Sequence, residues 1–286
     1  MESELRRGDV TLHFEATGPK DAPLAILLHG FPDTPHTFRH LAPRLVERGY
    51  RVVTPWSRGY APSSTSASAD YSLSALVGDA IALHHELGGD ERALLIGHDW
   101  GAATAYGACA LEPERWARCV TLAVPPLALF AAALLGFEQA RRSWYMWFFN
   151  NPFAEAVVAA NDFSFLDELW SSWSPGYDAT SDLERVKQCF SNPASLEAAL
   201  AYYRVMFAPA TDGGAVAAAQ AQRGRVPTLY LHGKDDGCVG AEILVGVEEH
   251  LAPTSRVSVL AGAGHFVHLE APEATWREID GFVSSV

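Results

Sequence analysis

Short apolar runs alternate with helix-forming segments along most of this chain. Several of the runs are apolar at almost every position, which is typical of parallel strands covered on both faces. The predicted strands are residues 10–14, 24–28, 51–54, 93–96, 119–124, 226–231 and 256–260, and the predicted helices include residues 38–48, 72–87, 102–111 and 241–250. The alternation predicts an α/β protein whose mostly parallel central sheet is flanked by helices on both faces.

The alternation is interrupted between residues 125 and 222. This interval contains no convincing buried strand, and Pro125 and Pro126 end the strand that precedes it. We therefore predict a core domain of residues 1–124 and 223–286 that carries an inserted helical cap of residues 125–222. The alanine-rich stretch at 127–135 suits a helix that lines the access route of an apolar substrate.

Composition and charge narrow the class of protein. Hydrophobic residues make up 49% of the 286 positions and charged residues 19%, as in ordinary globular proteins. The net charge of −13, from 34 acidic and 21 basic side chains, argues against binding to nucleic acid or to anionic membranes. Residues 119–137 carry no charge, but Pro125 and Pro126 divide them, so we expect no membrane span.

The cysteines and the N-terminus indicate the compartment. The four cysteines, Cys109, Cys119, Cys189 and Cys238, show no paired Cys-x-x-Cys spacing, so we expect neither a disulfide framework nor a structural metal. Residues 1–9 mix charges and lack the apolar core of a signal peptide. We therefore expect buried, reduced thiols in a cytoplasmic protein. The sequence does not determine the oligomeric state, and a homodimer stays open.

The strongest chemical signal is the segment Gly97, His98, Asp99, Trp100 and Gly101. It follows an apolar predicted strand and precedes a predicted helix, so it matches the sharp elbow Gly-x-Ser-x-Gly with aspartate in place of serine. A carboxylate that attacks carbon forms an ester on the enzyme, which favours alkyl transfer over acyl transfer. The helix N-terminus would stabilise the ionised form of Asp99. The structural alternative is an aspartate that only caps the helix.

A second loop, at residues 29–32, follows the predicted strand at 24–28. It can aim the backbone N–H of Phe31 at the point reached by the backbone N–H of Trp100, and the two donors would form an oxyanion hole. They would act when water attacks the carboxyl carbon of Asp99 and negative charge grows on its oxygen. A plain turn at the end of the strand is the alternative.

The C-terminal part supplies candidates for a general base and for the acid that orients it. His265 follows the last predicted strand in a glycine-rich loop, with His268 as a competitor for the role of base. After the predicted strand at 226–231, Asp235 and Asp236 are both candidates for the acid, and either could be a turn residue. Nucleophile, acid and histidine follow one another in the chain order usual for triads of this type.

These residues give the chain a resemblance to the epoxide hydrolase branch of the α/β-hydrolases over essentially its whole length. The resemblance is carried by residues 29–32, 97–101, 233–237 and 264–265. It selects Asp236 over Asp235 as the acid. It also implies that two cap tyrosines, Tyr145 and Tyr203, hydrogen-bond the epoxide oxygen and donate a proton, a task that suits a neutral phenol of high pKa. The expected substrate contacts are Phe31, Pro32, Trp100 and Trp144.

The resemblance thus implies an enzyme that converts a small apolar epoxide and water to a vicinal diol, with Asp99 as the nucleophile and no metal or organic cofactor. The first alternative is a haloalkane dehalogenase, which uses the same triad, although the two tyrosines and Phe31 in place of an asparagine favour the epoxide. A non-catalytic binding protein on a hydrolase scaffold is the second. The sequence identifies neither the epoxide, nor the carbon attacked, nor the preferred enantiomer.

Overall fold

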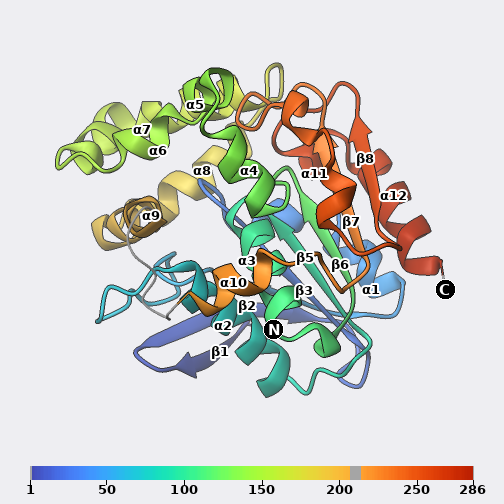
Figure 1. Ribbon diagram of the computed structural model, residues 1–286. Coiled ribbons are helices and arrows are strands. Elements are labelled where there is room, and N and C mark those ends of the chain that lie inside the picture. The colour runs from blue at the N-terminus through green and yellow to red at the C-terminus, as the bar shows by residue number, and fades with distance from the viewer. Residues whose placement is uncertain (1, 207–213, 286) are drawn as a thin grey trace.

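One twisted sheet forms the centre of the protein. The computed structural model describes residues 2–206 and 214–285, and in them eight strands form a single sheet in the order β1-β2-β4-β3-β5-β6-β7-β8 (Figure 1). β1 pairs antiparallel with β2, as β2 does with β4, and the other neighbours pair in parallel. The strands are β1 (Glu2–Arg7), β2 (Val10–Thr17), β3 (Leu24–Leu28), β4 (Arg51–Pro55), β5 (Ala93–His98), β6 (Trp116–Leu122), β7 (Thr228–Gly233) and β8 (Arg256–Leu260). The predicted fold class is confirmed.

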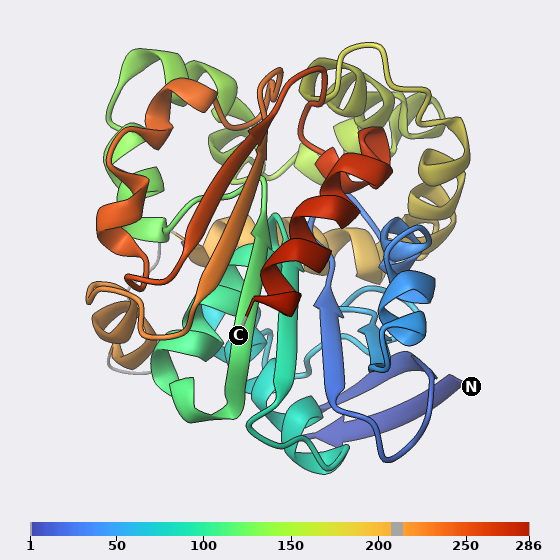
Figure 2. The same cartoon turned by 90° about the vertical axis from the view of Figure 1, so that its right-hand side faces the viewer.

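Helices cover both faces of this sheet (Figure 2). On one face, α2 (Leu73–Glu86) and α3 (Trp100–Leu111) pack against alternate residues of β3, including Ile26. On the other face, α1 (Ala42–Glu47) and α12 (Pro272–Ser284) pack against the intervening residues, including Leu27. Because successive side chains of a strand point to opposite faces, a strand covered on both sides must be apolar throughout, as β3 is.

The segment between β6 and β7, residues 123–227, is called here the β6–β7 insertion. Its described residues, 123–206 and 214–227, form no strand. In Figure 1, α5, α6 and α7 lie above the sheet, whereas α10 packs on α3 in the core. The helices are α4 (Leu127–Ala133), α5 (Phe137–Arg142), α6 (Trp144–Phe148), α7 (Ala154–Trp173, interrupted at residues 160–163), α8 (Thr180–Phe190), α9 (Pro193–Met206) and α10 (Ala215–Gln220). Throughout the described part of the chain, no helix is both long and apolar enough to cross a bilayer.

Two predicted helices need correction, and one strand was missed. Residues 38–48 are not one helix, because a 3₁₀ turn, η1 (Pro35–Phe38), precedes α1. Residues 241–250 form two 3₁₀ turns, η3 (Ala241–Leu244) and η4 (Val247–His250), because Gly246 between them has a φ of 82° that an α-helix does not accommodate. The edge strand β1 was not predicted, since its exposed positions are charged.

Candidate active site

Asp99 lies on a sharp turn between β5 and α3, two central elements of the fold. Its φ of 53° and ψ of −117° form a strained backbone conformation for a residue with a side chain. A Cβ at Gly97 would overlap the backbone of Gly101, and a Cβ at Gly101 would overlap the carbonyl of Leu28. The turn therefore requires both glycines. Since the Asp99 side chain makes no cap hydrogen bond to α3, the structure favours the elbow over the helix cap.

The buried carboxylate of Asp99 faces the loop that follows β3. The backbone N–H of Phe31, one of the two expected oxyanion donors, donates to Asp99 Oδ1 at 2.8 Å. Trp100, the other expected donor, is the first residue of α3 and directly follows Asp99. The loop is held by His29, whose Nε2 accepts from the backbone N–H of Ser57 at 3.0 Å. Burial lowers the pKa of His29 to about 4, which keeps the ring neutral and able to accept.

His265 joins Asp99 to a second buried carboxylate. Its Nε2 lies 3.6 Å from Asp99 Oδ2, and its Nδ1 lies 3.0 Å from Asp236 Oδ2. The other oxygen of Asp236, Oδ1, accepts from the backbone N–H groups of Cys238 at 2.7 Å and Val239 at 2.8 Å, so the turn itself orients this carboxylate. Asp235 is exposed on the same turn. The structure thus brings Asp99, His265 and Asp236 together.

The electrostatic surroundings favour an ionised Asp99 and a protonated His265. Burial alone would raise the pKa of Asp99, but His265 and the Phe31 N–H hold it below its usual value. Burial alone would lower the pKa of His265, but the neighbouring carboxylates of Asp236 and Asp99 raise it well above its usual value. Before any reaction, Asp99 is therefore the carboxylate that a nucleophile requires.

Two tyrosine hydroxyls lie close to this carboxylate. Tyr145 and Tyr203 are fully buried, their ring centroids are 5.6 Å apart, and both line the same cavity as Asp99. Tyr145 Oη lies 3.3 Å from Cys238 Sγ, whereas Tyr203 Oη has no hydrogen-bond partner in the described part of the chain. Burial raises the pKa of both phenols well above its usual value, so both keep their proton.

The cavity has a volume of about 510 Å³ and is predominantly apolar. Leu127, Ala128 and Ala131 line it from α4, and Val216 lines it from α10. Asp99 is the only charged side chain among the described residues that line it. This lining matches the groove-lining helix that the alanine-rich stretch predicts, and it suits a neutral apolar ligand.

The four expected substrate contacts occupy different positions. Trp100 lines the cavity, and the ring of Phe31 packs edge-on against Tyr203 with centroids 5.3 Å apart. Pro32 is buried next to Phe31 but does not line the cavity. Trp144 is 48% exposed, and its ring packs against phenylalanines of the β6–β7 insertion. The structure does not bring Trp144 to the cavity, since its place on α6 directs it toward solvent.

Cys238 is a residue of this site that the sequence did not reveal as such. It lines the cavity, contacts Tyr145 through Sγ and holds Asp236 through its backbone N–H. Cys238, Asp236 and His265 also offer one metal-ligand atom each within 4.8 Å of the others. The available signal was its place two residues after Asp236, on the turn that carries the acid.

Comparisons with known proteins agree with this geometry. A family model described as the α/β hydrolase fold matches residues 23–272. The AB hydrolase superfamily protein YfhM of Bacillus subtilis is 31% identical over 267 residues, which cover 92% of this chain and 91% of that protein. Epoxide hydrolase 4 of Mus musculus is 29% identical over 278 residues, which cover 94% of this chain and 75% of that protein.

Solved structures agree as well. A structure described under novel epoxide hydrolases from metagenomes of hot environments superposes with a TM-score of 0.85 at 27% identity, covering 100% of this chain and 99% of the other. Epoxide hydrolase VrEH1 of Vigna radiata superposes with a TM-score of 0.83 at 26% identity, covering 100% and 98%. With its sheet order, its elbow and a family match over most of its length, the chain belongs to the α/β hydrolase fold family.

Proposed function

We propose that this protein is an epoxide hydrolase that opens a neutral, apolar epoxide through a covalent ester on Asp99. The observation that carries the proposal is the meeting of an ionised carboxylate and two protonated phenols in one apolar cavity. An epoxide needs both groups, since its ring opens by attack on carbon and leaves an alkoxide that takes up a proton. The epoxide hydrolase names of several relatives support the same reaction.

In the first step, one carboxylate oxygen of Asp99 attacks an epoxide carbon, and the bond from that carbon to the ring oxygen breaks. Tyr203 and Tyr145 hydrogen-bond the ring oxygen, and one of them donates its proton as the alkoxide develops. The unpartnered hydroxyl of Tyr203 is the freer of the two to bind the ligand. The products of this step are a hydroxyalkyl ester on Asp99 and a phenolate.

In the second step, water adds to the carboxyl carbon of Asp99 while His265 takes up its proton. The backbone N–H groups of Phe31 and Trp100 stabilise the oxyanion, and the ester breaks to release the diol. Ester formation has removed the negative charge of Asp99, which lowers the pKa of His265, so His265 gives up its proton, the phenolate of the first step takes up one, and Nε2 is free to act as base with Asp236 orienting the ring. When the ester breaks, the proton of the regenerated Asp99 carboxyl passes to the leaving alkoxide and completes the diol, which returns Asp99, His265 and the tyrosine to their starting forms.

The reaction type is tested with two series of substrates. Purified protein is incubated with styrene-type and alkyl epoxides and, separately, with haloalkanes of similar size. We expect a vicinal diol from the epoxides and no halide ion from the haloalkanes, because the cavity offers phenols that protonate an alkoxide. Halide release without diol formation would instead identify a dehalogenase, and turnover of neither series would contradict the proposed function.

The proton donor is tested by comparing two adjacent tyrosines. We expect Tyr203→Phe to lower kcat for ring opening by about 10²-fold, the lower end of the contribution of a general acid. Tyr202→Phe is the matched control, because Tyr202 Oη donates to the carbonyl of Arg58 at 2.7 Å and is committed to that bond. The measurement is single-turnover consumption of epoxide. Equal rates for Tyr203→Phe and the parent protein would contradict the assigned role.

A further inference from the structure

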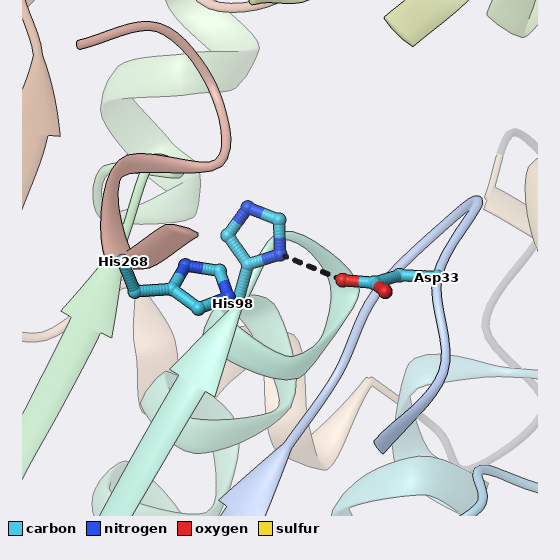
Figure 3. Close-up of side chains that lie close together, drawn as sticks. All are labelled: Asp33, His98 and His268. Carbon is cyan, nitrogen blue, oxygen red and sulfur yellow. Dashed lines mark ion pairs between the residues drawn. The ribbon is translucent and has the colours of Figure 1, made fainter. Parts of the chain in front are cut away.

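A second polar cluster lies behind the catalytic residues, away from the cavity. Asp33 lies in the loop after β3, His98 is the last residue of β5, and His268 lies on α11 (Val267–Glu270). Figure 3 shows the three side chains converging, with Asp33 and His268 on opposite sides of His98. All three are buried, with exposed fractions of 2%, 0% and 2%, and none of them lines the cavity. Asp33 Oδ2 lies 3.8 Å from His98 Nδ1, and one ligand atom of each residue lies within 4.8 Å of the other two.

In each of these three side chains, one polar atom already takes part in a hydrogen bond. His98 Nε2 donates to the carbonyl of His265 at 3.1 Å, which fixes the tautomer and leaves Nδ1 as a bare acceptor. Asp33 Oδ1 accepts from the backbone N–H of Thr34 at 2.7 Å. His268 Nε2 lies 2.5 Å from Thr37 Oγ1, and when it donates there its Nδ1 also keeps a lone pair.

Three remaining atoms have no hydrogen-bond partner within residues 2–206 and 214–285: Asp33 Oδ2, His98 Nδ1 and His268 Nδ1. Asp33 Oδ2 and His98 Nδ1 face each other at 3.8 Å without a hydrogen bond, and burial raises the pKa of Asp33 well above its usual value because it disfavours the charged carboxylate. A divalent cation would displace the proton of Asp33, compensate the charge of the carboxylate and take one nitrogen from each histidine. Two imidazoles and one carboxylate, each held by a further hydrogen bond, form the ligand set and outer shell typical of zinc sites.

We propose that Asp33, His98 and His268 bind a divalent transition-metal ion of the Zn²⁺ type. Burial lowers the pKa of His98 to about 3 and that of His268 well below its usual value, so both rings are in the neutral form that ligates metals. The ligands adjoin the catalytic groups: Asp33 is two residues after Phe31, His98 precedes Asp99, and His268 is three residues after His265. The ion therefore ties together the three segments that carry the oxyanion donor, the nucleophile and the base, and takes no part in the chemistry.

The group formed by Asp236, Cys238 and His265 competes for the same ion. Its ligand atoms also lie within 4.8 Å of one another. However, His265 Nδ1 and Asp236 Oδ2 already form a hydrogen bond of 3.0 Å, whereas Asp33 Oδ2 and His98 Nδ1 have no hydrogen-bond partner among the described residues. The two groups differ in one measurable respect, because only the competitor contains sulfur.

The test is Zn²⁺ binding to protein prepared in a chelator, measured by equilibrium dialysis. We expect one tightly bound ion per chain and a rise in Tm of about 5 °C at a free Zn²⁺ concentration of about 100 times Kd. Asp33→Asn and His268→Gln should each weaken binding by at least about 100-fold, the upper end of the loss caused by removing an outer-shell partner. His84→Gln and Cys238→Ser are the controls and should bind as the parent does, because His84 is a buried histidine with an unpartnered Nδ1 outside the cluster.

X-ray absorption spectroscopy of the Zn²⁺-loaded parent protein identifies the types of atom that bind the ion, and it needs no substituted variant. We expect a shell of nitrogen and oxygen that includes imidazole scattering and no sulfur. A sulfur ligand, loss of binding in Cys238→Ser, or the absence of saturable binding to the parent would each overturn the proposal. None of these readouts depends on turnover of an epoxide, so they separate this proposal from the proposed function.

Discussion

Replacing Asp99 by alanine is expected to lower kcat/KM for an epoxide by about 10⁴-fold or more, as for the loss of a covalent nucleophile in other enzymes. Alanine is preferred to asparagine because it leaves no side-chain oxygen near His265. The strained backbone at φ 53° remains, and among the described residues the removed carboxylate accepts one hydrogen bond, from the Phe31 N–H, and pairs with His265, so we expect the variant to fold. Diol formation under steady-state conditions measures the loss. Asp235→Asn, an exposed carboxylate on another loop, is the control and should react as the parent does.

The covalent route through Asp99 is tested further with a single turnover in oxygen-18 water and excess enzyme. The oxygen that enters the first molecule of diol comes from the Asp99 carboxylate, so that diol should be unlabelled and the protein should gain the label. Labelled diol together with unlabelled protein would show direct attack by water and would contradict the nucleophilic role.

Replacing His265 by glutamine is expected to separate the two steps. Ring opening needs Asp99 and the tyrosines, so a first turnover should still consume epoxide. Hydrolysis needs the base, and steady-state turnover should fall by about 10³-fold or more. Intact-protein mass spectrometry should show the enzyme heavier by the mass of one substrate. If no adduct accumulates although turnover is lost, His265 is required for the first step and its assignment as base is wrong.

The acid that orients His265 offers a matched pair of variants. Asp236→Asn should lower steady-state turnover by about 10⁴-fold, since the amide no longer selects the productive tautomer of the histidine. Asp235→Asn removes the same charge one residue away, from a side chain that is exposed, and should have little effect. Equal losses in both would contradict the choice of Asp236.

The fold could be predicted because its central strands are buried on both faces of the sheet. β3 and β5 are apolar at nearly every position because helices cover both faces, and such runs stand out in a sequence. β1 escaped prediction because one side of it faces solvent and carries Glu2, Glu4 and Arg6. Its place in the sheet depends on pairing with β2, which no local pattern encodes. The boundaries given for the core and the cap stay a prediction.

Parts of the site could be predicted where the backbone geometry requires a particular type of residue in the sequence. Gly97 and Gly101 mark the elbow because a Cβ at either position would overlap the backbone. No required glycine of this kind distinguishes Asp235 from Asp236, since both adjoin a turn. In the structure the two residues differ in the direction of their side chains. No local sequence pattern reveals the cluster around His98, because Asp33, His98 and His268 are far apart in the chain and meet only when the sheet assembles.

The apolar lining of the cavity also bears on how the enzyme releases what it makes. The proposed hydration would turn one ring oxygen into two hydroxyl groups, and enclosing a hydroxyl that lacks a partner costs about 1–3 kcal/mol. Leu127, Ala128 and Ala131 offer such groups no hydrogen bonds, whereas they fit the hydrocarbon part of the substrate. The proposed reaction would therefore convert a ligand that prefers the cavity into one that prefers water, and this change in partition would favour departure of the product and limit its competition with fresh substrate.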